Sequence, residues 1–94
     1  MERAYELMMI IAPETTDEEK ETVIAFVEKN INAMNVKQVA IEKMGNKKLA
    51  YPIDKKNTGY YVLFKFIGDG TGHNELERKL NMQEKIMRYL FVKA

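Results

Sequence analysis

Alternating apolar and polar positions divide the chain into short strands and two helical stretches. In the first strand, Arg3–Ala12, one face would carry Tyr5, Leu7, Met9 and Ile11. The other face is also largely apolar, which predicts a central position in a sheet. A proline follows at position 13 and would end the strand.

A helical stretch begins with Thr16-Asp17-Glu18-Glu19, which matches the capping box of a helix N-terminus. Apolar residues then follow at spacings of four, four and three, and so share one helical stripe: Val23, Val27, Ile31 and Met34. The pattern predicts a helix from Asp17 to Met34.

The middle of the chain predicts a β-hairpin. Val36–Met44 reads as a strand, Gly45-Asn46 interrupts it with a bulge or sharp twist, and Lys47–Ile53 resumes it. Pro52 cannot donate to a β-ladder, so this strand should lie at a sheet edge. A polar turn is expected over 54–59, and a strand rich in aromatic and β-branched residues over 60–67.

The rest of the chain predicts a flexible loop over 68–72, a short helix over Asn74–Asn81 and a last strand over Ile86–Lys93. The order β-α-β-β-α-β indicates an α+β, ferredoxin-like fold, with a four-stranded antiparallel sheet and two helices on one face. We expect residues 1–94 to form a single domain.

One face of such a sheet is packed against the helices and the other is open for binding. In the strand over 60–67, the more uniformly apolar set should lie in the core: Tyr60, Val62, Phe64 and Phe66. The alternate set should then lie on the open face: Tyr61, Leu63 and Lys65.

Composition argues against an enzyme. The chain contains neither cysteine nor serine, which removes the commonest nucleophiles, thiolate metal sites and disulfides. His73, the one histidine, lacks an orienting partner in the sequence and reads as a surface loop residue. No acidic spacing resembles a calcium loop. We expect no catalytic residue, no metal, no cofactor and no small-molecule substrate.

The glycines at 68, 70 and 72 fit neither the dinucleotide fingerprint nor the P-loop spacing. A ferredoxin-like enzyme of the acylphosphatase kind would need a phosphate-binding loop that the sequence lacks. The start of the chain has no signal-peptide pattern, and the apolar run Leu7–Ala12 is too short to span a bilayer. We therefore expect a soluble, cytoplasmic protein with no membrane partner.

Charge is unevenly distributed although its sum is only +1. Residues 13–34 carry two basic and six acidic side chains, a net −4, while residues 36–67 carry seven lysines against Glu42 and Asp54, a net +5. Such a lysine-rich hairpin can attract a polyanion. The same lysines could instead keep a β-hairpin soluble and protect its edge. Charge alone leaves both interpretations open.

The segment 44–66, MGNKKLAYPIDKKNTGYYVLFKF, resembles the signature hairpin of a bacterial ribosomal family, small-subunit ribosomal protein six. The matching residues are Met44-Gly45, Lys47-Lys48, Leu49-Ala50-Tyr51 and Gly59-Tyr60-Tyr61. The opening Tyr5-Glu6 with Pro13, the Leu76-Glu77-Arg78 triplet and the ending over Arg88–Lys93 match as well. Lysines stand where the family often has paired arginines, which keeps the charge but loses bidentate phosphate geometry.

This resemblance implies a non-enzymatic ribosomal protein of the cytoplasmic ribosome. It implies binding to the central domain of small-subunit ribosomal RNA, as a heterodimer with ribosomal protein eighteen. The expected RNA contacts are Arg3, Lys47, Lys48, Lys55, Lys56 and Arg88. The expected partner contacts are Tyr51, Tyr61 and Leu63. The alternative is a ferredoxin-like small-molecule regulatory or oligomerisation module that does not bind RNA.

Overall fold

A computed structural model describes residues 2–53 and 55–93, without the side chains of residues 50, 51 and 53. Its elements follow the expected order: β1 (Arg3–Ile11), α1 (Asp17–Asn32), β2 (Val36–Ile53), β3 (Lys56–Gly68), α2 (His73–Asn81) and β4 (Ile86–Lys93). No helix in the described ranges is long and apolar enough to cross a bilayer.

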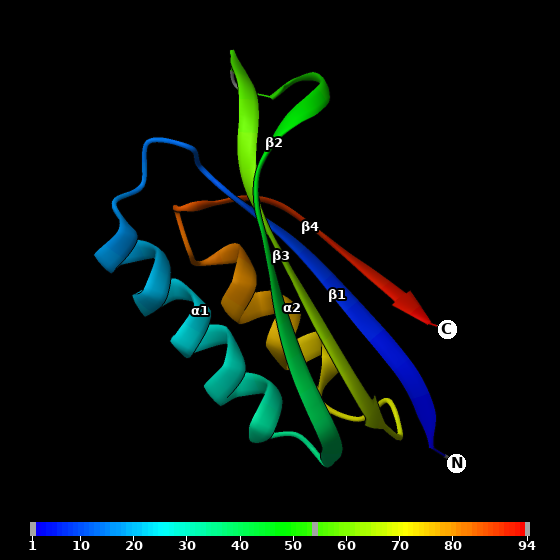
Figure 1. The fold of residues 1–94 in the computed structure, drawn as a ribbon. Helices are drawn as coiled ribbons and strands as arrows, with labels where there is room; N and C mark the ends of the chain where they lie inside the picture. Colours follow the sequence, from blue (N-terminus) through cyan, green and yellow to red (C-terminus); the bar gives the residue numbers. More distant parts are fainter. Residues whose placement is uncertain (1, 54, 94) are drawn as a thin grey trace.

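The four strands form one antiparallel sheet in the order β2-β3-β1-β4. Both helices cover the same face of this sheet, and the other face is open (Figure 1). The ferredoxin-like arrangement is therefore confirmed. The apolar β1 lies centrally, as its two apolar faces predict, and β2 lies at an edge, as Pro52 requires.

The core lies between the sheet and the helices. Leu7 on β1 stands opposite Phe64 on β3, Met9 stands opposite Val62, and all four side chains are completely buried. They pack against the predicted stripe of α1, where Val23, Ile24, Val27 and Ile31 are buried. Burying one such side chain contributes about 1.5–3 kcal/mol, so these few residues dominate the stability of the fold.

The capping box at the start of α1 forms as predicted. The Thr16 hydroxyl accepts a hydrogen bond from the Glu19 backbone N–H, and the Glu19 carboxylate accepts one from the Thr16 backbone N–H. The helix ends at Asn32, two residues before Met34. Met34 instead folds back in the turn that leads to β2 and packs against the core.

The β2–β3 hairpin is more regular than the sequence suggested. Gly45 produces a bulge with a positive φ of 87°, yet pairing continues on both sides of it, so β2 is a single strand. A second bulge occurs at Gln38, which has a φ of 55°. The predicted turn over 54–59 is too long, because β3 already begins at Lys56.

The far end of this hairpin extends beyond the rest of the sheet. The last pair between β1 and β3 is Ile11–Tyr60, so residues 56–59 of β3 pair with β2 alone. We call residues 47–53 and 55–59 the arm. Figure 1 shows the arm projecting past both helices and past β1.

Candidate nucleic-acid interface

Three lysines of the arm are exposed: Lys47, Lys48 and Lys55. No carboxylate in the described part of the chain lies within ion-pair distance of any of them. An ammonium group without a carboxylate partner is available to neutralise a phosphate. The lysines predicted from the hairpin sequence are thus brought together in space on a projecting element.

Lys47 and Lys48 point to opposite sides of the arm. Lys47 stands opposite Gly59 and Lys48 opposite Thr58, and neighbouring residues of a strand face opposite ways. A Cβ at Gly59 would overlap the Ile10 side chain, which lies on the open face of the sheet. Lys47 therefore lies on the open-face side of the arm and Lys48 on the helix side.

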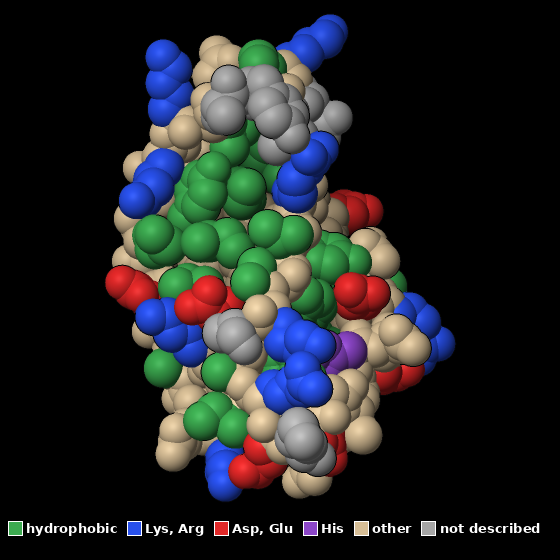
Figure 2. Space-filling model, turned by 90° about the vertical axis from the view of Figure 1, so that its right-hand side faces the viewer, with side chains coloured by type: hydrophobic (Ala, Val, Ile, Leu, Met, Phe, Trp, Pro, Cys, Tyr) green, Lys and Arg blue, Asp and Glu red, His purple; other side chains and the backbone are tan. Residues whose placement is uncertain are grey.

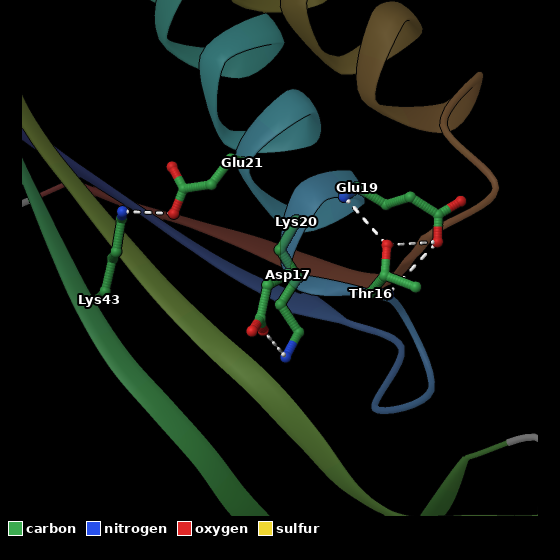
Figure 3. A network of polar contacts seen from close by, with 6 residues as sticks. All are labelled: Thr16, Asp17, Glu19, Lys20, Glu21 and Lys43. Atoms are coloured by element: carbon green, nitrogen blue, oxygen red, sulfur yellow. Dashed lines mark hydrogen bonds and ion pairs between the residues drawn. The ribbon is translucent and has the colours of Figure 1, made fainter.

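Two other lysines of the hairpin make ion pairs with acidic residues of α1 or of the loop before it. Lys43 Nζ lies 2.6 Å from Glu21 Oε1 (Figure 3), and Lys56 Nζ lies 3.4 Å from Glu14 Oε1. The hydrogen bond to Glu21 raises the pKa of Lys43. The positive charge of the hairpin is therefore partly neutralised on the helix side.

The two predicted arginines occupy different places. Arg88 on β4 stands opposite Ile10, close to the base of the arm, and is exposed on the open face. Arg3 stands opposite Gly68, at the end of the sheet away from the arm. The six predicted RNA residues thus do not form one patch, because Arg3 is separated from the others by the length of β1.

The open face is apolar where it borders the arm. Tyr61 and Leu63 are half-buried on this face, as predicted. The predicted partner residue Tyr51 has its side chain outside the described residues. Figure 2 shows hydrophobic side chains joined into a continuous area, with lysines and arginines at its borders.

Sequence reasoning missed two residues of this apolar surface. Leu90 and Val92 on β4 are 61% and 42% exposed, and they stand opposite Met8 and Glu6 of β1. The alternation of β4 places Leu90 and Val92 on the same face as Arg88, which is exposed, and this pattern could have identified them. Both faces of this strand carry apolar residues, so alternation alone could not say which side was open.

His73 is not the surface loop residue that the sequence suggested. It is the first residue of α2, is half-buried, and packs between the rings of Tyr5 and Phe91, at centroid distances of 4.6 and 5.1 Å. Within the described ranges no group of three metal-ligating side chains forms a cation site. The imidazole contributes to aromatic packing at the end of the core.

The preceding loop is fixed by Asp69. Its carboxylate accepts hydrogen bonds from the Thr71 hydroxyl at 2.7 Å and the Thr71 backbone N–H at 3.0 Å. These bonds, with a weaker one from Asn35, lower the pKa of Asp69 from 3.8 to about 2. Asp69 thus acts as a structural brace that closes the turn into α2.

Comparison with known proteins gives consistent matches over nearly the whole chain. Residues 4–93 match the family model described as Ribosomal protein S6. The small ribosomal subunit protein bS6 of Fusobacterium nucleatum is 45% identical over 91 residues, which cover 97% of each chain. The bS6 protein of Koribacter versatilis is 32% identical over 94 residues, and the chain spans 64% of that longer relative.

Comparison with solved structures also gives matches over the whole fold. The crystal structure of 30S ribosomal protein S6 from Thermotoga maritima matches with a TM-score of 0.91 at 35% identity, covering 100% of this chain and 89% of the other. The B. subtilis GlnK–ATP complex matches with a TM-score of 0.51 at 5% identity, covering 98% and 84%. At that identity the second likeness shows a shared fold alone.

Proposed function

The chain belongs to the ribosomal protein S6 family, and from that premise we propose that it binds small-subunit ribosomal RNA as a heterodimer with ribosomal protein eighteen. Family membership confirms that it is a protein of the small ribosomal subunit, within the cytoplasmic ribosome, and not an enzyme. The observation that carries the proposal is an exposed apolar sheet face (Figure 2), bordered by an arm whose exposed lysines have no carboxylate partner among the described residues.

The open face suits a protein partner better than RNA. Its exposed side chains Leu90 and Val92, and the half-buried Met8 and Leu63 beside them, are aliphatic or thioether groups. Such groups neither neutralise phosphates nor stack on bases, whereas they add to the apolar centre of a protein interface. Tyr61, with a ring and a hydroxyl at the edge of this surface, fits the same role. We assign the partner contact to this face.

The arm suits the RNA backbone. Lys47, Lys48 and Lys55 can each displace condensed counterions from a phosphate, and Arg88 extends the positive charge from the base of the arm along β4. Within the described strands this surface offers few aromatic rings for base stacking. We therefore assign recognition to RNA shape and backbone, which positions the protein without reading sequence directly.

The two surfaces explain how a protein of net charge +1 can bind RNA. Three or four exposed cations give weak, salt-sensitive binding on their own. A second, more basic protein docked on the open face would extend the positive surface. Once one protein of the pair has bound RNA, the other is held close to it, so its effective concentration at the RNA is raised. The affinity of the pair then increases although no single contact improves.

A titration of a small-subunit central-domain RNA with the isolated chain, and then with the partner present, tests the proposal. We expect weak binding alone and much tighter binding with the partner. Lys47→Ala with Lys48→Ala should lower the affinity and reduce the slope of log K against log salt by about two units at most. Strong, salt-insensitive binding by the isolated chain would contradict the proposal.

A matched pair of substitutions tests the protein surface. Leu90→Gln removes an exposed apolar group from the open face, and Met82→Gln removes one, 73% exposed, that follows α2. Neither change should alter folding, because both side chains face solvent. Only Leu90→Gln should weaken binding of the partner, measured by calorimetry. Equal effects of the two variants would remove the open face from the interface.

A further inference from the structure

The helix side of the hairpin carries a row of three lysines. Lys43 stands opposite the buried Val62, and Lys48 stands opposite Thr58, so both side chains lie on the side of the sheet that faces α1. Lys56 lies on the same side, two residues before Thr58 on β3, and its ammonium group reaches Glu14 in the loop before α1. If all three charges were free, this row could neutralise successive phosphates of an RNA chain.

Two of the three charges are already occupied. Glu21 holds Lys43 and Glu14 holds Lys56, while Lys48 between them has no carboxylate within ion-pair distance among the described residues. The paired lysine side chains remain 45% and 37% exposed. Ion pairs this exposed are weak in water, so an RNA phosphate could compete for either lysine.

The first turns of α1, which carry Glu21, are held in place by the fold. The capping box fixes the first turn of α1, and Lys20 in the next turn is nearly buried, with 12% of its side chain exposed. Its ammonium group lies 3.6 Å from Asp17 (Figure 3). The same group lies 4.5 Å from the centre of the Tyr60 ring on β3. The start of α1 is therefore anchored to the hairpin, and Glu21 is presented beside Lys43.

We propose that Glu14 and Glu21 determine which lysines reach RNA, by acting as internal counterions that withhold Lys43 and Lys56 from phosphates. This inference rests on the proposed RNA binding and deepens it. Contacts to phosphates carry no sequence information, so each withheld lysine lowers the affinity for any RNA. The two carboxylates also repel a phosphate chain from the helix side, which favours its contact with Lys47 on the open-face side of the arm.

The test compares Glu21→Gln with Glu18→Gln. Both residues are exposed on the same helix, and both changes add one unit to the net charge. Among the described residues, however, Glu18 forms no ion pair with a lysine. The probe is polyuridylate, with affinity measured over a range of salt concentrations in the isolated chain and in the complex with its partner. Glu21→Gln should bind about fivefold tighter at ~0.1 M salt, because a slope of about 0.7 per contact acts over one decade.

Glu21→Gln should also steepen the salt slope by about 0.7, whereas Glu18→Gln should leave the slope unchanged. Glu14→Gln should behave like Glu21→Gln through Lys56. Adding Lys43→Met to Glu21→Gln should abolish the gain, since the freed ammonium group is then absent. Thermal unfolding of each variant shows that the chain remains folded.

The possible results distinguish failure of this inference from failure of the proposed RNA binding. Equal gains for Glu21→Gln and Glu18→Gln would mean that overall charge is responsible, and a gain that survives Lys43→Met would mean that the freed Lys43 ammonium group is not its source. Either result would overturn this inference alone. No RNA binding by the unmodified chain, with or without its partner, would instead overturn the proposed function.

Discussion

Two adjacent threonines before α1 have opposite environments. Thr16 caps the helix, whereas Thr15 is 5% exposed and its hydroxyl has no hydrogen-bond partner among the described residues. A buried hydroxyl without a partner costs free energy relative to a methyl group of the same shape. Thr15→Val should therefore leave the free energy of unfolding unchanged or raise it by about 1 kcal/mol.

Thr16→Ala is the matched change and should act in the opposite direction. It removes the capping oxygen and should lower the free energy of unfolding by about 1 kcal/mol. Urea denaturation of both variants measures the two effects. A clear loss of stability in Thr15→Val would show that its hydroxyl has a partner after all.

Gly59 and Gly45 are required for different reasons. A side chain at Gly59 would overlap Ile10 and touch Leu49, whereas Gly45 has open space around it and a φ of 87°. Gly59→Ala should cost about 1–3 kcal/mol through overpacking, and Gly45→Ala about 1 kcal/mol through backbone strain. In an Ile10→Ala background, Gly59→Ala should cost less, whereas the cost of Gly45→Ala should be unchanged. Double-mutant cycles of unfolding free energies measure both effects.

At the level of single elements, the loop between β3 and α2 should respond to acid through Asp69. Its pKa is lowered to about 2 in the folded chain, so the stability that it contributes is present above its ordinary value of 3.8 and is lost as the pH falls toward 2. In Asp69→Asn this part of the pH dependence should be absent. Thermal midpoints of both proteins between pH 5 and pH 2 measure the difference; parallel curves would contradict the assignment.

The elements that sequence predicts well are those whose signals are local. The capping box lies within four residues, and the alternation of β3 separates Val62 and Phe64 from Tyr61 and Leu63 without knowledge of any partner strand. Gly45 likewise marked its bulge. The continuity of β2 through that bulge depends on pairing with β3, which no local pattern contains. The bulge at Gln38 carried no signal, since glutamine has no special preference for a positive φ.

The residues of the candidate site were proposed from the sequence, whereas their geometry comes only from the fold. The sequence identified the lysines of the hairpin, yet which face each one takes is set by the register of β2 against β3. The ion pair between Lys43 and Glu21 joins positions 22 residues apart, and that between Lys56 and Glu14 joins residues still further apart. Such contacts follow only from the packing of α1 on the sheet.

At the scale of the whole molecule, the fold gives two distinct surfaces that meet at the base of the arm. The open face presents apolar groups along β1, β3 and β4, and the arm presents cations beyond the edge of the core (Figures 1 and 2). Acidic groups are concentrated on α1, on the other side of the sheet. The proposed protein partner and the proposed RNA would therefore bind to separate surfaces.

The projecting arm should open locally more often than the rest of the sheet. A ribbon of two strands without a third neighbour is only marginally stable in water, so its backbone amides should exchange with deuterium sooner than those of β1. Lys48 and Thr58 report this opening in a mass-spectrometric or NMR exchange experiment. Binding of RNA should slow amide exchange in the arm more than in any other element. The bound RNA would restrain the two strands, which have no third strand beside them.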